Sequence, residues 1–473
     1  MYYQIKISIL YVVTVLLTGC ATYHSVPIDN SAVNLALKGP SMEKVRVHAK
    51  MIKHPILKPI DFDDRDGISP DEAAILAVLA NPALRAIRDR REVSMAQVIQ
   101  AGILPNPQLS YSLDMPTGGN TQGTINAFGL GLGWDITSLI VRNARIDAAR
   151  YRMDSVDIDL AWQEWQVAQA AKLQVYRLLW IGQQLKLAKE AVKELRENLK
   201  IVEKSVKFGE LTAVDLAAAE AALQQIRILQ LKLIQEQKHG QIALNQALGL
   251  PANRTFSVQQ NIPLPSWPAL PSAPKITEGL AERRLDLLAL KKGYESQEAG
   301  VRAAILSQFP KINIGLTHAG DTTNVVSTGF AVTIDLPFFD RKQGQIALEQ
   351  ATRNQLFDEY MARLFEARSE INRILLDMDS VKQQISATEK FIAELKGLVQ
   401  IYYTALQVGN ADILVYYNTK NELITKQIEH VKLEQELSDL GISLEIAAGE
   451  YFPGFDISLN DPSKKSDTLE VLE

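Results

Sequence analysis

The chain has 473 residues, of which 47% are apolar but only 7% aromatic, a balance that suits long helices better than one large globular interior. Its 50 basic and 55 acidic residues are mixed along the sequence and leave a net charge of −5, so no basic field is available for nucleic acid. The totals predict an elongated or layered protein and argue against a nucleic-acid partner.

The N-terminus carries a predicted export signal. A short apolar run follows Lys6 and ends before Cys20, and it is shorter than the roughly 20 apolar residues that span a bilayer. The sequence Leu17-Thr18-Gly19-Cys20 resembles the bacterial lipobox, in which the cysteine is acylated and becomes the mature N-terminus. A buried structural cysteine is the alternative, but the position directly behind the apolar run favours lipidation. Because Cys20 is the only cysteine, no disulfide is expected.

The remainder of the sequence repeats itself. Gly209 and Gly409 each end a long helical pattern and are separated by 200 residues (409 − 209), and the same offset relates "GLGWDI" to "AVTIDL". We therefore interpret the chain as two copies of one unit. The predicted segments are a signal peptide at 1–19, a lipid-anchored N-terminal segment at 20–69, the first repeat at 70–250, a Pro-rich linker at 251–275, the second repeat at 276–452 and a C-terminal tail at 453–473.

Each copy is predicted to open with a helix of moderate length, at 70–102 and at 277–307. Ser69, followed by a proline and two acidic residues, can cap the first helix, and Thr277 can cap the second. The two helices are expected to be equivalent.

Two stretches with strand periodicity follow each of these helices. Apolar and polar or small residues alternate in "PQLSYSLDM" at 107–115 and again at 124–136, and the second copy repeats the pattern at 312–316 and 330–336. The segments "PTGGNTQG" and "AGDTTNV" supply the turn residues between them. One β-hairpin is therefore predicted in each copy.

The sequence then changes to helical periodicity without any proline. Residues 143–207 predict one helix of 65 residues, about 98 Å long. Apolar residues recur at coiled-coil spacing in both copies, at Val192, Leu195, Leu199, Val202 and Val206 and at Phe391, Leu395, Leu398, Tyr402 and Ala405.

A sharp turn is predicted at the end of each long helix. Gly209 and Gly409 can take the left-handed conformation that closes a helix, and Thr212 and Asp412 can cap the helix that follows. A flexible kink is the alternative for either glycine alone, but finding both at equivalent positions favours a turn. Each copy is therefore predicted to contain a long antiparallel helical hairpin.

Four strands from two hairpins cannot cover their own edges, so further chains must close the sheet. Strand lengths near ten residues, alternation rich in glycine, and aromatic residues at strand ends suit a transmembrane β-barrel, with a soluble sandwich as the alternative. The predicted fold class is mainly α with membrane β-hairpins, built as a two-fold internal repeat.

The order of elements, together with "FGELTAVDLAAAEAAL" in the first turn and "VGNADILVYYNTKNEL" in the second, resembles the TolC-type outer membrane efflux factors from about 70 to 452. "LPFFDRKQGQI" at 336–346 further resembles the heavy-metal (cobalt-zinc-cadmium) branch of that family. What the resemblance implies is a homotrimer whose three chains of four strands form a 12-stranded β-barrel, continued into the periplasm by an α-barrel of helical hairpins.

By the same resemblance, the chain is the outer membrane exit duct of a tripartite efflux system, with a periplasmic adaptor and an inner-membrane pump of the resistance-nodulation-division type. The expected cargo is heavy-metal cations, with drug efflux or type I protein secretion as alternatives and a periplasmic adaptor as a weaker one. The adaptor would dock on the hairpin tips, where we single out Gly209, Leu211, Thr212, Gly409 and Asp412.

The resemblance also implies a gate at the periplasmic end. The positions that constrict the lumen in relatives map to Leu414 and Asn418, the second of which carries an amide where an acid is usual. The two residues form an i, i+4 pair on one helical face. The alternative is that both pack against the neighbouring helix.

The sequence shows no constellation for catalysis. Its six histidines are scattered, with no metalloprotease spacing, no second cysteine and no P-loop, so neither an enzyme, a cofactor nor a metal site is predicted. His48 and His54 could form a loose metal contact, but we expect both to face solvent.

Overall fold

The computed structural model describes residues 23–251, 254, 256–259, 262–265, 267, 269, 272–408 and 410–452. The predicted signal peptide, Cys20, Gly409 and the predicted tail at 453–473 lie outside the described residues. The chain divides into two compact units, Met1–Gly39 and Pro40–Glu473. In the described part of the first unit, helix α2 (Asn30–Leu37) begins at Asp29, whose side chain accepts a hydrogen bond from the amide of Ala32.

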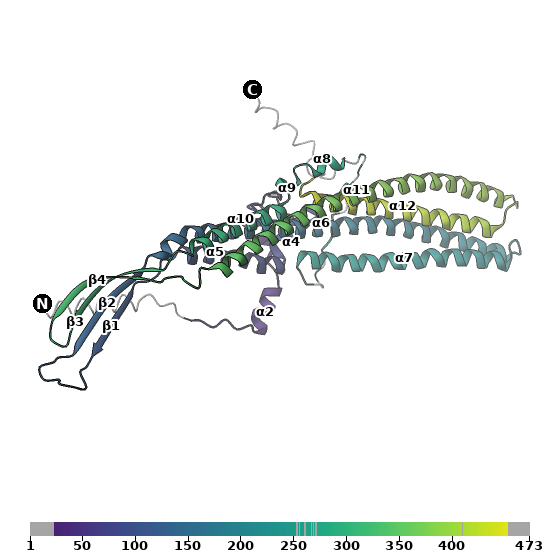
Figure 1. The fold of residues 1–473 in the computed structure, drawn as a ribbon. Coiled ribbons are helices and arrows are strands. Elements are labelled where there is room, and N and C mark those ends of the chain that lie inside the picture. Colours follow the sequence, from purple (N-terminus) through teal and green to yellow (C-terminus); the bar gives the residue numbers. More distant parts are fainter. Residues whose placement is uncertain are drawn as a thin grey trace, which may run out of the picture. The chain divides into compact units, whose positions relative to one another are not determined.

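The second unit contains both repeats, and Figure 1 shows the strands at one end of it and the turns of the helical hairpins at the other. Its elements are α3 (Met42–Ala49), α4 (Pro70–Ala80), α5 (Pro82–Gly102), β1 (Gln108–Asp114), β2 (Ala127–Asp135), α6 (Thr137–Lys207), α7 (Ala213–Leu248), α8 (Ala273–Thr277), α9 (Leu280–Arg283), α10 (Leu285–Leu306), β3 (Ile312–Gly320), β4 (Val326–Ile334), α11 (Gln343–Gln407) and α12 (Ile413–Ala448).

The opening helix of each repeat is interrupted, where the sequence predicted one continuous helix. Asn81 separates α4 from α5 with an extended backbone, because Pro82 disfavours the helical conformation of the residue before it. Arg284 separates α9 from α10 with a similarly extended backbone, although Leu285 rather than a proline follows it. The end of a helical hairpin packs against each break. A β-carbon added to Gly249, at the end of α7, would lie 2.6 Å from the α-carbon of Asn81, and one added to Gly449, at the end of α12, would lie 3.2 Å from the α-carbon of Arg284.

The four strands form one antiparallel sheet in the order β1-β2-β3-β4, so the two hairpins predicted from the sequence are joined through β2 and β3. Its two faces differ sharply in composition. One row across the sheet consists of Leu109, Leu132, Leu316 and Phe330, and the adjacent row on the opposite face consists of Ser110, Gly131, Thr317 and Gly329. One face is therefore apolar and the other is small and polar, as a barrel between lipid and water requires.

The long helices and their turn follow the prediction. Helix α6 has 71 residues and α11 has 65. Gly209 adopts a left-handed conformation (φ +75°), and Thr212 and Asp215 form a capping box at the start of α7. In the second hairpin, Asp412 caps α12 by accepting a hydrogen bond from the amide of Leu414.

The predicted apolar seam is confirmed in the first hairpin and is wrong for part of the second. Val192, Leu195 and Val202 are buried. In α11, Leu395 is buried, but Phe391 and Leu398 remain 40% and 41% exposed within the chain. The spacing identified an apolar stripe correctly, but the stripe is wider than the contact that one partner helix offers.

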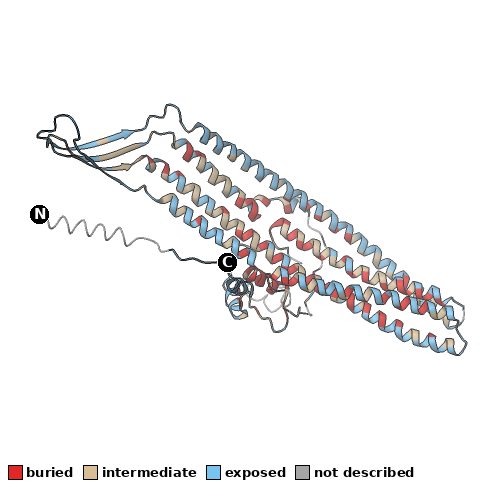
Figure 2. Ribbon diagram, turned by 90° about the horizontal axis from the view of Figure 1, so that it is seen from below, coloured by how far each residue is buried: buried red, intermediate tan, exposed pale blue. Residues whose placement is uncertain are grey.

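Among the described residues, two large apolar clusters and one small one, of Val141, Ala144 and Ala303, form the core. The larger of the two lies around Trp165 and Leu287 and joins α4, α6, α10, α11 and the end of α12. The smaller lies closer to the hairpin turns, around Leu195, Ile226 and Tyr417. In Figure 2 the buried residues lie mainly along the helices, whereas the strands are mostly intermediate or exposed. No helix in the described part of the chain combines the length and apolar character that crossing a membrane would require.

Candidate functional site

The turns of the two hairpins expose apolar residues to solvent. Phe208 precedes Gly209 and is 80% exposed, and Val408 at the equivalent position of the second repeat is 66% exposed. Leu211 is partly buried against the smaller core cluster, whereas Thr212 and Asp412 are exposed and cap their helices. The first turn therefore has a defined backbone, and the described residues of both turns present an apolar surface, which suits docking of another protein.

The predicted gate residues lie on the open face of α12. Leu414 is 43% exposed within the chain, and Asn418 is also exposed. The opposite face of the same turns is buried through Tyr416, Tyr417 and Lys420. This segment of α12 is thus held by one face and presents Leu414 and Asn418 on the other.

A buried lysine fixes this segment of α12 to the first hairpin. The Nζ of Lys420 lies 2.5 Å from Oε1 of Glu194 in α6 and 3.3 Å from the hydroxyl oxygen of Tyr416. Burial alone lowers the pKa of Lys420, but the Glu194 carboxylate and Tyr416 outweigh it and raise that pKa above its usual value. The neighbouring Asn421 donates hydrogen bonds to Ala222 and Gln225 of α7. Sequence analysis missed these residues because a lysine in a helix usually faces water.

The same interface between the hairpins carries further polar pairs. The pairs across α6 and α12 are Gln169 with Glu445 (3.0 Å), Arg177 with Asp439 (2.8 Å) and Gln184 with Gln435 (2.9 Å). Specific polar pairs of this kind fix the register of two packed helices. The interface also has an apolar part, because the smaller cluster joins Leu195 and Ile226 of the first hairpin with Tyr417 of the second.

A second buried lysine anchors the end of α12. Lys172 is 2% exposed, lies 3.3 Å from Asp71 and stacks over the ring of Tyr451. Burial lowers its pKa, and the charges of Asp71 and Glu445 more than compensate, so the net shift is upward. This cluster ties the first repeat to the residues that follow α12.

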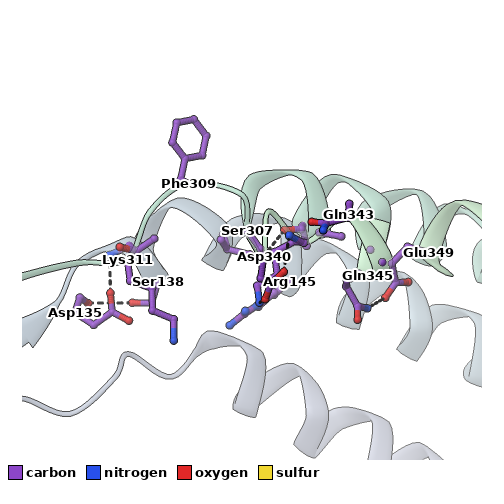
Figure 3. Close-up of a pocket in the computed structure, with 18 of the residues that line it drawn as sticks. Asp135, Ser138, Arg145, Ser307, Phe309, Lys311, Asp340, Gln343, Gln345 and Glu349 are labelled. Carbon is purple, nitrogen blue, oxygen red and sulfur yellow. Dashed lines mark hydrogen bonds and ion pairs between the residues drawn. The ribbon is translucent and has the colours of Figure 1, made fainter. Parts of the chain in front are cut away.

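A cavity of about 1020 Å³ lies where the sheet meets the helices. Figure 3 shows charged side chains of both signs around it, among them Asp135, Arg145, Lys311, Asp340 and Glu349. Asp135 pairs in register with Asn313 on the small, polar face of the sheet. The Asp135 carboxylate accepts a hydrogen bond from the amide of Thr137 (2.9 Å) at the start of α6. The cavity thus continues the polar face of the sheet toward the helices.

One histidine contradicts the prediction. His54 does not face solvent: its Nε2 donates to the carbonyl of Ala161 (2.8 Å), and its Nδ1 accepts from the amides of Ile56 and Leu57. Burial lowers the pKa of His54, which favours the neutral ring. In the described ranges, no three His, Cys, Asp or Glu side chains are arranged to hold a metal ion.

The comparisons with known proteins agree with this architecture. The profile of the family described as "Outer membrane efflux protein" matches residues 75–250 and 277–450, which together make up most of the chain. The pyoverdine export outer membrane protein OpmQ of Pseudomonas putida is 21% identical over 434 residues, covering 89% of this chain and 83% of OpmQ.

Two metal efflux proteins are similar over a shorter stretch. The cation efflux system protein CusC of Escherichia coli is 24% identical over 282 residues, covering 56% of this chain and 60% of CusC. The cobalt-zinc-cadmium resistance protein CzcC of Cupriavidus metallidurans is 24% identical over 296 residues, covering 62% of this chain and 68% of CzcC.

Solved structures show the same fold. The crystal structure of CusC superposes with a TM-score of 0.67 at 19% identity, covering 85% of this chain and 99% of CusC. The outer membrane channel OprN superposes with a TM-score of 0.69 at 15% identity, covering 91% of this chain and 99% of OprN. The chain belongs to the outer membrane efflux protein family, the TolC-type channels, and is an outer membrane exit duct rather than an enzyme.

Proposed function

We propose that three copies of this chain form a continuous duct that joins a periplasmic adaptor to the cell exterior. The observation that carries the proposal is the sheet, which has one apolar face and two open edges, β1 and β4. Unpaired backbone groups cannot face lipid, so the edge of one copy must pair with the edge of the next. Three copies of a four-stranded sheet give a 12-stranded barrel.

The helices support the same assembly. Helices α5 and α11 lie beside α6 and α10 and carry long exposed stretches, with apolar residues such as Ile99 (65% exposed) and Phe365 (73% exposed). In the sequence, α5 leads into the edge strand β1, and α11 follows the edge strand β4. Closing the sheet would therefore also bring α5 of one copy against α11 of the next and close the α-barrel.

We assign adaptor docking to the hairpin turns and the closed gate to α12. The exposed Phe208 and Val408 and the turn residues Gly209, Thr212 and Asp412 supply the docking surface. In the trimer, three Leu414 side chains form an apolar constriction and three Asn418 amides form a neutral polar ring, which holds cations less strongly than carboxylates would. The inner-membrane partner is a pump of the resistance-nodulation-division type.

The proposed cargo is heavy-metal cations, supported by the names and similarity of CusC and CzcC. Export of a siderophore-like solute is a second candidate, because OpmQ aligns over the largest share of the chain among these relatives. Two assays on a gene-deletion strain complemented by this chain separate them. Metal export restores growth at raised cation concentration, whereas siderophore export restores the solute in the medium.

Cys20, which lies outside the described residues, is the proposed lipid anchor. Cys20→Ala should abolish incorporation of labelled fatty acid and slow delivery to the outer membrane, although barrel insertion can still hold the mature protein there. Equal lipid label on the variant and the wild type would refute the anchor.

The duct itself is tested in planar bilayers with the purified full chain. We expect discrete conductance steps, small while the gate is closed. A protein that inserts into the bilayer without conducting under any voltage would contradict the duct.

A further inference from the structure

The two repeats differ where the sheet is connected to the long helix. In the first repeat β2 ends at Asp135 and α6 begins at Thr137, whereas in the second repeat β4 ends at Ile334 and α11 begins only at Gln343. The longer connection, residues 335–342, carries three exposed apolar side chains: Leu336 is 66% exposed, Phe338 69% and Phe339 94%. At the offset of 200 residues their counterparts are Ile136, Ser138 and Leu139, which lie at the start of α6, and Leu139 is only 42% exposed.

The 335–342 connection is held in shape by its own hydrogen bonds. The side chain of Gln343 donates to the carbonyl of Phe339 (3.1 Å) and accepts from the amide of Arg341 (2.8 Å). Lys342 adopts a left-handed conformation (φ 61°), and its Nζ lies 2.7 Å from the carboxylate of Asp340. These bonds define the backbone from Phe339 to Gln343, from which the Phe339 side chain is exposed.

The connection lies at the edge of the chain, and a matching patch lies at the other edge. At the end of α5, Ile99 is 65% exposed, Ile103 58% and Leu104 44%. This end of α5 leads directly into the edge strand β1, just as the 335–342 connection leads away from the edge strand β4.

Contacts across the helices place the two features at the same height. The carbonyl of Gly102, at the end of α5, accepts a hydrogen bond from Arg142 of α6. The neighbouring Val141 packs in a small cluster with Ala303 of α10, and both residues line the cavity that Phe339 also lines. The end of α5 and the connection are therefore level with each other on opposite sides of the same layer of helices.

We propose that Phe338 and Phe339 of one copy dock on the patch formed by Ile99, Ile103 and Leu104 of the next copy, at the junction of the β-barrel and the α-barrel. This inference rests on the proposed trimer and assigns the longer connection a role in it. Pairing β4 with β1 of the next copy brings these two surfaces together at one level. Both are apolar, and each is left open by its own chain.

Disulfide trapping in the full chain tests the contact. The double variant Phe339→Cys with Ile103→Cys should form, on mild oxidation in membranes, a trimer that resists SDS and is released by reductant. Phe208→Cys with Ile103→Cys is the matched control, because Phe208 is similarly exposed but lies at the hairpin turn. That control and each single variant should give no trimer.

A separate mass measurement on the same variants in mild detergent distinguishes the two possible failures. If the mass shows a trimer but oxidation traps none, the docking is refuted and the trimer stands. If the mass shows a monomer, the proposed assembly fails and the docking with it.

A second readout does not depend on disulfide geometry. Phe338→Ser with Phe339→Ser should lower the temperature at which the trimer dissociates by several degrees, whereas Phe208→Ser should leave it unchanged. A spin label on Phe339→Cys should be shielded from oxygen dissolved in lipid. Strong oxygen accessibility would show that this side chain faces the membrane, and it would overturn the proposal.

Discussion

Helices α6 and α11 occupy equivalent places in the two repeats, yet they are buried very differently. In α6, 25 of 71 residues are buried within the chain, whereas in α11 only 6 of 65 are. Helix α6 contacts α4, α5, α7, α10 and α12, while α11 contacts mainly α10 and α12. Sequence equivalence therefore does not imply structural equivalence: α6 is the scaffold of the chain, whereas α11 is largely exposed and would be covered in the proposed trimer.

The largest difference between the two helices is expected when a core residue of α6 is substituted. Trp165→Ala removes a fully buried ring that packs edge-on against Tyr451, with ring centroids 4.8 Å apart, and should destabilise the chain by about 3–5 kcal/mol. Thermal unfolding followed by circular dichroism checks this. The matched change in α11, Phe365→Ala, should leave helix content intact and reduce only the assembled fraction. Equal loss of helix content in both variants would contradict the distinction.

The polar interface between α6 and α12 gives the next largest effect. Glu194→Gln leaves the Lys420 ammonium buried without its carboxylate, which should cost about 1–3 kcal/mol. Because Lys420 holds the gate segment, the variant should also raise the closed-state conductance in planar bilayers. Glu389→Gln, at an exposed position of α11, is the control and should change neither. Unchanged conductance in Glu194→Gln would show that the Lys420–Glu194 pair does not help to keep the gate closed.

The turns test whether the two hairpins serve one docking surface. Gly209→Val places a β-branched residue at φ +75°, which costs on the order of 1–3 kcal/mol of local strain even though its β-carbon would meet no neighbour. Export should fall while the barrel remains folded. Val214→Ala, at an exposed position beyond the turn, is the control for lost apolar surface. Normal export by Gly209→Val with Gly409→Val would count against docking at these turns.

Substitutions of the two proposed gate residues should change conduction but not the stability of the chain. Leu414→Ala should raise single-channel conductance, because three apolar side chains no longer narrow the lumen. Asn418→Asp should introduce block by divalent cations from the periplasmic side. Thr419→Ala, on the next position of α12, serves as the control. If neither Leu414→Ala nor Asn418→Asp changes conductance or block, the constriction lies elsewhere.

The smallest expected effect concerns pH. His54 has a folded-state pKa below its usual 6.5, because burial disfavours the charged ring. Its contribution to stability is therefore fully present above pH 6.5 and is lost as the pH falls toward the folded-state pKa. His54→Gln should flatten this part of the pH dependence of unfolding. An identical pH profile in the variant would show that His54 is not the group responsible.

The fold was largely predictable because its signals are local and repeated. Alternating strands, proline-free helices and turn residues at a fixed offset each indicate one element, and together they predicted the sheet, both hairpins and the caps at Thr212 and Asp412. The break at Asn81 had a local signal in Pro82, whereas no proline follows Arg284. Both breaks also accept a close approach from far along the chain, by Gly249 and Gly449, and the offset of 200 residues (449 − 249) between those glycines was the available signal.

The site was less predictable, since its polar residues act through tertiary contacts. Lys420 and Lys172 look like ordinary surface lysines in sequence and become buried only where helices of both repeats meet. His54 was likewise expected to face solvent, because its contact with the distant carbonyl of Ala161 is not visible in the sequence. Conversely, Phe391 and Leu398 have the spacing of a core seam and lie exposed, because periodicity reports an apolar stripe but not which chain covers it.

In the proposed trimer, two further copies of the same chain cover the exposed α11 and the open edges of the sheet. Native mass spectrometry of the full protein extracted in mild detergent measures this assembly. We expect a single species with three times the mass of the mature chain, which persists on dilution. A stable monomer under the same conditions would contradict the trimer.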